Sequence, residues 1–140
     1  LNLPAEIVRR VSREGESALP PEVPALIPPP PEQEPMLRQA FAAHGSDGSD
    51  EDFDRFVRVQ SLWDTAMANQ ALSWSRRLDR PLVAIAGAGH VAHGWGIAHR
   101  LRRLDPDAAI AIVMPWRGDG PLDPDQADLF FYCPRDSSAG

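Results

Sequence analysis

The pattern of apolar and polar residues is clearest in the middle of the chain, between Phe53 and Leu78. Apolar side chains recur there every three or four residues, a spacing that predicts one long amphipathic helix. They are Phe56, Val59, Trp63, Met67, Ala71, Trp74 and Leu78. Because Pro81 follows, the helix has to end near Leu78, and we expect its apolar stripe to pack against a sheet.

Three shorter segments also have helical spacing: Pro4–Arg13, Met36–His44 and Ile97–Leu104. A Pro-rich segment, residues 19–35, separates the first two. A run of prolines lacks backbone donors and stays extended. We interpret this segment as a stiff spacer rather than as a ligand for an SH3-type domain.

Residues 45–52 form an acidic loop rich in glycine and serine. A calcium-binding EF-hand needs ligands at fixed positions, a central glycine and a closing glutamate, and that register is absent. We therefore expect a solvated loop in which Asp50 or Asp52 caps the long helix.

Two apolar runs, Leu82–Ala86 and Ala108–Met114, predict strands buried on both faces of a parallel sheet. With the helix Ile97–Leu104 between them, they would form a right-handed βαβ unit. Leu129–Tyr132 is expected to be a short strand at an edge. The predicted fold class is therefore α/β, three-layered, with a mostly parallel sheet.

Composition narrows the class of protein. At 140 residues the chain suits one domain, which we place at residues 1–134, followed by a loose polar tail at 135–140. A net charge of −6 with scattered arginines argues against nucleic-acid binding. Cys133 is the single cysteine, so no internal disulfide forms. No apolar run approaches the ~18 residues of a membrane span.

The run Leu82–Ala86 leads into a turn, residues 87–96, that contains four glycines and two histidines. Ligands of open α/β sheets bind beyond the carboxyl ends of strands, so His90 is the candidate functional side chain. The turn matches the dinucleotide fingerprint G-x-G-x-x-A. That interpretation is disfavoured, because later glycines interrupt the helix that such a site needs and the next strand does not end in an acidic residue. No nucleotide is expected.

Two other interpretations of His90 stay open. It could form a metal site with His93 and His99, but a catalytic zinc usually has three protein ligands, no carboxylate lies beside them in sequence, and His99 is expected at the surface. Alternatively, His90 only bonds to a neighbouring loop. The surrounding glycines and the isolated Trp95 favour room for a flat aromatic ligand.

Gln60 and Asp64 are four residues apart on the long helix, at the edge of its apolar stripe. Polar groups so placed either hydrogen-bond to a loop or face a cleft. From this pattern alone, a structural hydrogen bond is the favoured interpretation.

Taken together, these segments resemble the ChaN-like haem-binding uptake family of bacteria, within the broader Tiki and erythromycin-esterase-like group. The residues that carry the resemblance are FVRVQSLWDTAMA at 56–68, VAIAGAGHV at 83–91, GWGI at 94–97 and the opening LPAEIVRRV at 3–11. The likeness covers nearly the whole chain in the order of the family. Ala98 departs from the proline that relatives often have after Gly-Ile.

The resemblance implies an α/β domain whose members carry paired G-x-x-H motifs around a cleft. Residues 87–90 would be the second motif, and the first, with the amino-terminal half of the domain, is expected to precede Leu1. Carried over by position, the ligand-binding residues would be Gln60, Asp64, Met67, Gly87, Gly89, His90, Gly94, Trp95 and Gly96.

The function that the resemblance implies is binding of haem, or of a related tetrapyrrole, for bacterial iron acquisition without catalysis. His90 is a candidate ligand for the metal, although haem iron also accepts Tyr, Met or Cys. The alternative is a metal-dependent hydrolase in which His90 is the general base or metal ligand and Asp64 or Gln60 orients it. The resemblance also implies the cell envelope, reached as a lipoprotein or through preceding sequence, and allows a homodimer.

Overall fold

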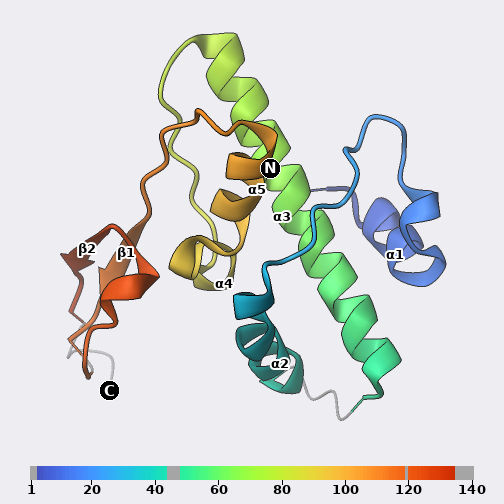
Figure 1. Cartoon of the computed structure of the whole chain (residues 1–140), viewed down its shortest axis with the longest axis horizontal. Helices are drawn as coiled ribbons and strands as arrows, with labels where there is room; N and C mark the ends of the chain where they lie inside the picture. The colour runs from blue at the N-terminus through green and yellow to red at the C-terminus, as the bar shows by residue number, and fades with distance from the viewer. Residues whose placement is uncertain (1–2, 44–47, 119, 135–140) are drawn as a thin grey trace.

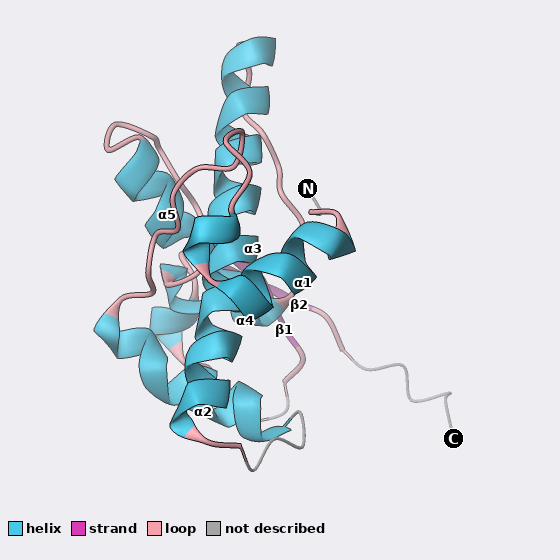
Figure 2. Ribbon diagram, turned by 90° about the vertical axis from the view of Figure 1, so that its right-hand side faces the viewer, coloured by secondary structure: helices cyan, strands magenta, loops and turns pink. Residues whose placement is uncertain are grey.

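The computed structural model describes residues 3–43, 48–118 and 120–134, and helices dominate it (Figure 1 and Figure 2). Its principal helices are α1 (Ala5–Glu14), α2 (Glu34–Ala43), α3 (Asp50–Leu78) and α5 (Ile97–Leu104), and its strands are β1 (Val113–Trp116) and β2 (Leu129–Tyr132). The long helix α3 is central, because α1, α2 and α5 all pack against it. The two strands lie to one side of the helices.

The three shorter predicted helices are confirmed to within two residues at each end, as α1, α2 and α5. Gly15 follows α1 with φ of +82°, a conformation that suits glycine and stops the helix. In the described ranges, none of the helices combines the length and the apolar character that crossing a bilayer requires.

Helix α3 starts three residues before the predicted Phe53 because its N-terminus is capped by Ser49. The Ser49 hydroxyl accepts a hydrogen bond from the N–H of Asp52, and the Asp52 carboxylate accepts one from the N–H of Ser49. The pKa of Asp52 lies below its ordinary value, first because the Ser49 hydroxyl donates to its carboxylate at 2.9 Å and second because the N–H of Ser49 does. Ser49 is thus the N-cap residue, and Asp52, one of the two expected capping residues, completes the capping box. Residues 45–47 of the expected acidic loop and the expected tail, 135–140, lie outside the described residues.

The middle of α3 is buried around most of its circumference rather than along a single stripe. One apolar cluster joins α3 to α1, and its buried members are Leu3, Val11, Leu62 and Ala66. A second apolar cluster joins α3 to α5, and its buried members are Met67, Ala68 and Ile97. Trp74 and Leu78, expected within the stripe, are exposed. The prediction that α3 packs against a sheet was wrong, since the elements that pack most extensively against it among the described residues are the helices α5, α1 and α2.

The Pro-rich segment, residues 19–35, crosses α3 between α1 and α2 (Figure 1). Its single 3-10 turn, η2 (Pro31–Gln33), leads directly into α2. The segment is fixed at Ile27, whose N–H donates to Oγ1 of Thr65 on α3 at 3.1 Å. The expected spacer is therefore held against the long helix, and we call it the Pro-rich strap.

The run Leu82–Ala86 is the clearest departure from the predicted fold. It pairs with no other strand in the described part of the chain, and Val83 and Ile85 are 87% and 92% exposed. The prediction of a buried strand here was wrong. A buried parallel strand needs neighbours that satisfy its backbone and helices that cover both faces, and the described residues supply neither.

The strands β1 and β2 pair in parallel, with Val113 opposite Leu129 and Trp116 opposite Tyr132. This pairing confirms the α/β class, with a smaller sheet than expected. The predicted strand Ala108–Met114 is shifted towards Trp116, because pairing extends only as far as the four residues of β2. The connection between β1 and β2 contains the 3-10 turn η4 (Pro124–Gln126). The expected βαβ unit, in which α5 joins Leu82–Ala86 to Ala108–Met114, does not form among the described residues, because Leu82–Ala86 is not a strand.

Candidate functional site

The glycine-rich turn folds into one short helix, α4 (Ala88–Val91), followed by the 3-10 turn η3 (Ala92–Gly94). His93 and Gly94 have φ of +57° and +69°, a left-handed conformation that L side chains rarely adopt. This reversal of the backbone separates α4 from α5 and lets both lie close to α3.

The turn brings His90 against Asp64 of α3, and their Nδ1 and Oδ1 atoms are 2.7 Å apart. A carboxylate can only accept, so Nδ1 carries the hydrogen and donates it. Asp64 is 1% exposed, whereas the His90 side chain is 29% exposed. Nε2 is therefore the ring nitrogen that Asp64 does not engage, on a side chain that is partly open to solvent.

Arg100 of α5 holds the second oxygen of the same carboxylate, with Nη1 3.4 Å from Oδ2 of Asp64. The same Nη1 donates to the backbone oxygens of Trp95 at 2.6 Å and Gly96 at 3.3 Å. Arg100 is 1% exposed. Burial lowers the pKa of its guanidinium, and the negative charge of Asp64 opposes that effect.

Arg100 is the centre of a network that contains all the polar and charged side chains buried in the described residues. These are Gln33, Ser61, Asp64, Thr65 and Arg100, which we call the polar cluster. Arg100 donates to Oε1 of Gln33 at 3.4 Å, to Oγ of Ser61 at 3.5 Å and, through Nε, to the backbone oxygen of Ile27 at 3.1 Å. Within the described ranges, every buried side-chain polar atom has a hydrogen-bond partner.

Sequence reasoning found Asp64 but missed the rest of the polar cluster. A signal was present, because Ser61, Asp64 and Thr65 lie within about one turn of each other in an otherwise apolar part of α3. Buried polar groups at such spacing require a partner from another element. Nothing in the local pattern around Arg100 identifies it as that partner.

Gln60 and Met67, the other site residues expected on α3, have different surroundings. Gln60 is half-buried one turn before Asp64, and no hydrogen bond joins it to His90 in the described residues. Met67 is buried in the apolar cluster between α3 and α5. Contact of either side chain with a ligand stays a prediction.

The four glycines of the turn divide into two pairs. A Cβ at Gly96 would overlap the backbone carbonyl of His90, and a Cβ at Gly94 would lie 3.0 Å from the guanidinium of Arg102. Gly87 and Gly89 are exposed, and a Cβ at Gly89 would meet nothing within 4 Å. The first pair allows α5 to approach α4, and the second leaves an open surface beside His90.

Trp95 is half-buried and stacks on the ring of His93, with centroids 4.1 Å apart and an angle of 17° between the planes. Nε2 of His93 lies 3.9 Å from Oδ2 of Asp123. The stacked pair therefore links the turn to η4 instead of standing free, and Trp95 as a wall for a ligand stays a prediction.

His99 is half-buried and keeps part of its side chain at the surface. Burial, followed by the charges of Arg100 and Arg103, lowers its pKa. Among the described residues, no three His, Cys, Asp or Glu side chains gather in a group that could hold a metal ion.

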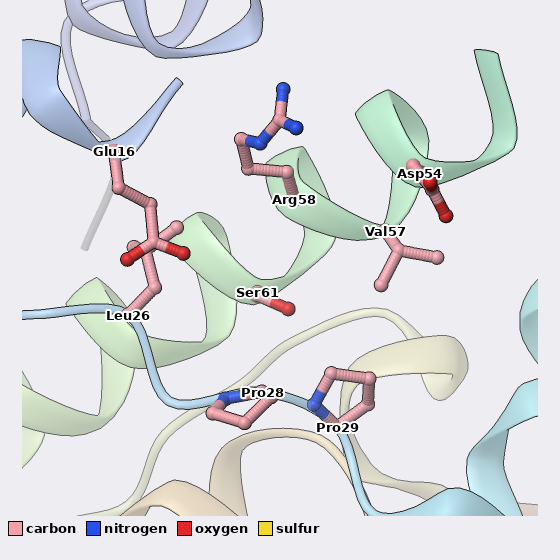
Figure 3. Close-up of a pocket in the computed structure, with 8 residues that line it drawn as sticks. All are labelled: Glu16, Leu26, Pro28, Pro29, Asp54, Val57, Arg58 and Ser61. Carbon is pink, nitrogen blue, oxygen red and sulfur yellow. The ribbon is translucent and has the colours of Figure 1, made fainter. Parts of the chain in front are cut away.

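A cavity of about 330 Å³ lies between α3 and the Pro-rich strap (Figure 3). It is lined by Glu16, Leu26, Pro28, Pro29, Asp54, Val57, Arg58 and Ser61. Its volume is at the lower end of the range for small-molecule sites. None of the residues expected in the site lines it, and Ser61 is the residue that it shares with the polar cluster.

Comparison with known proteins places the chain in a family. No curated protein and no solved structure matches it. A model of the family described as haem-binding uptake, Tiki superfamily, ChaN matches residues 1–101 of the 140. The match includes His90, Asp64 and Arg100, and it ends before the two strands. The chain therefore belongs to the ChaN family of haem-binding uptake proteins in the Tiki superfamily.

Proposed function

We propose that this protein binds haem, with Nε2 of His90 as a ligand of the iron. The observation that carries the proposal is the 2.7 Å hydrogen bond from Nδ1 of His90 to the buried carboxylate of Asp64. Histidines that bind metals commonly donate their other ring N–H to a carboxylate, which fixes the tautomer and makes the free nitrogen more basic. His90 has this arrangement and is partly open to solvent.

The donor set also fits haem better than a bare metal ion. A bare zinc ion needs three or four protein ligands, and the described residues contain no such group. Haem iron already has four nitrogen ligands from the macrocycle, so one oriented imidazole from the protein is enough. When bound, the cofactor would supply a metal centre, and His90 would hold it through Nε2.

The surroundings of His90 can supply the contacts that a flat apolar ligand needs. Gly87 and Gly89 present little side chain, and Val83 and Ile85 are exposed in the extended segment that leads to the turn. Burial of such apolar surface against the macrocycle would contribute most of the binding free energy. We include Gln60, Met67, Gly94, Trp95 and Gly96 in the proposed site as its border on α3 and on the turn.

Titration of the protein with hemin, followed by the Soret band, tests the proposal. We expect a saturable shift of the band in the wild-type protein and its loss, or at least a tenfold weaker binding, in His90→Ala. The control is Arg103→Lys, a change at an exposed position of α5 that is not part of the contact between His90 and Asp64. A His90→Ala variant with unchanged affinity and an unchanged spectrum would exclude His90 as the ligand.

The description of the family as haem uptake supports a role in iron acquisition. We infer that this role takes place at the bacterial cell envelope and without catalysis. Deletion of the gene should slow growth when hemin is the sole iron source and leave growth on ferric salts unchanged. Sedimentation with and without hemin would test the homodimer that the resemblance allows, because a dimer of this chain doubles the sedimenting mass.

A second candidate function, hydrolysis, rests on the same pair of residues. A histidine oriented by a buried carboxylate is also the arrangement of a general base. Among the described residues, however, no serine, threonine or cysteine side chain hydrogen-bonds to His90, so a nucleophile would have to be water. Ester or peptide hydrolysis that is lost in both His90→Ala and Asp64→Asn would support this function, and activity that survives either change would reject it.

A further inference from the structure

We propose that Arg100 is a positioning residue for His90 and that it acts through Asp64. Because Arg100 also binds the Pro-rich strap, the position of the strap affects the orientation of the His90 imidazole. The proposal rests on the proposed haem-binding function for its consequence, but the geometry that supports it does not involve the ligand. Arg100 itself cannot contact a ligand, because it is 1% exposed.

The first step is the position of the Asp64 carboxylate. Its Oδ1 accepts from His90, and its Oδ2 faces Nη1 of Arg100 at 3.4 Å. Each oxygen thus has a different partner, and the carboxylate cannot rotate without losing one of them. The guanidinium therefore fixes the plane of the carboxylate, and the carboxylate in turn fixes the imidazole.

The second step is the way in which Arg100 is itself held. Its Nη1 donates to the backbone oxygens of Trp95 and Gly96, which belong to the same turn as His90. Its Nε donates to the backbone oxygen of Ile27 in the Pro-rich strap at 3.1 Å. A guanidinium has five donors in one rigid plane, so these contacts define a single orientation that a lysine ammonium cannot reproduce.

The third step connects the strap to the site. Ile27 uses both of its backbone groups in the polar cluster, since its N–H donates to Thr65 and its oxygen accepts from Arg100. Thr65 directly follows Asp64 on α3. If the strap moves away from α3, Arg100 loses its hydrogen bond to the backbone oxygen of Ile27. The guanidinium is then less well oriented, and so is the Asp64 carboxylate that it contacts.

The experiment compares Arg100→Lys with Arg103→Lys, a matched control on an exposed position of the same helix. In the ligand-free protein, ¹⁵N NMR of the imidazole should show His90 mainly as the Nδ1–H tautomer in the wild type and the control, and as a mixture in Arg100→Lys. In hemin titrations, Arg100→Lys should bind about 10- to 100-fold more weakly, the usual effect of losing a residue behind a metal ligand. The Soret band and the EPR signal of the complex should change as well.

A second variant, Thr65→Val, removes the acceptor for the N–H of Ile27 and leaves Arg100 in place. It should shift the His90 tautomer and the hemin affinity in the same direction as Arg100→Lys, by a smaller amount. It also provides the test if Arg100→Lys does not fold, which circular dichroism would show. Unchanged tautomer and affinity in the folded variants would overturn the proposal. If the wild type does not bind hemin, the proposed function fails, while the tautomer of His90 still tests the role of Arg100.

Discussion

The polar cluster and the apolar extended run Leu82–Ala86 are built in opposite ways. In the polar cluster, charged and hydroxyl side chains are buried, and each has a partner from a distant part of the chain. In the extended run, apolar side chains that usually lie in a core are exposed to solvent. The comparison teaches that burial follows from the available partners and not from side-chain polarity alone.

The largest expected difference in stability is between alanine substitution of a buried leucine and of an exposed leucine. Leu62 is fully buried between α3 and α1, and Leu62→Ala should lower the free energy of unfolding by about 2–5 kcal/mol. Leu129→Ala in β2 removes the same atoms from an exposed position and should cost less than about 0.5 kcal/mol. Urea denaturation followed by circular dichroism measures both, and a large loss in Leu129→Ala would show that the strands carry a core of their own.

A smaller effect is expected from two glycines of the turn. Gly96→Ala introduces a Cβ that overlaps the carbonyl of His90, so the turn must shift and stability should fall by about 1–3 kcal/mol. Gly89→Ala adds a methyl group in open space within α4 and should leave stability unchanged or raise it by up to about 1 kcal/mol. Thermal unfolding of the two variants would contradict this account if their order were reversed.

The pH dependence of stability should contain a modest contribution from His99. Its pKa in the folded protein lies below the ordinary value of 6.5, so the unfolded chain binds a proton more readily. Stability from this group is therefore fully present above about pH 6.5 and is lost as the pH falls towards the folded pKa. His99→Gln should flatten the fall in unfolding free energy between about pH 7 and pH 5, and a variant with an unchanged slope would contradict this assignment.

The smallest change in stability is expected where the apolar side chains are exposed. Val83→Ser and Ile85→Ser together should leave the unfolding midpoint unchanged, because neither side chain is buried on folding. The double variant should bind less of the fluorescent dye ANS, which reports exposed apolar surface. A fall of several degrees in the midpoint would instead mean that the run packs against another part of the molecule.

The same comparison explains how much of the fold and site could be predicted. The periodic spacing of α1, α2, α3 and α5 depends on local sequence, and these helices were predicted to within three residues. The proximity of His90 and Asp64 was anticipated through the resemblance to the ChaN-like family, which places both residues at one cleft. Strand pairing and Arg100 could not be found in this way, since each depends on partners far away in sequence.

The tie between Ile27 and the polar cluster has a consequence for folding. The cluster joins residues that are 38 and 73 positions apart, so a state in which only α3 has formed leaves these groups without partners. Contacts of such long range make unfolding cooperative, because opening one of them exposes the rest. The amide of Ile27, although it lies in a segment without regular secondary structure, should therefore exchange with deuterium as slowly as the most protected amides of α3.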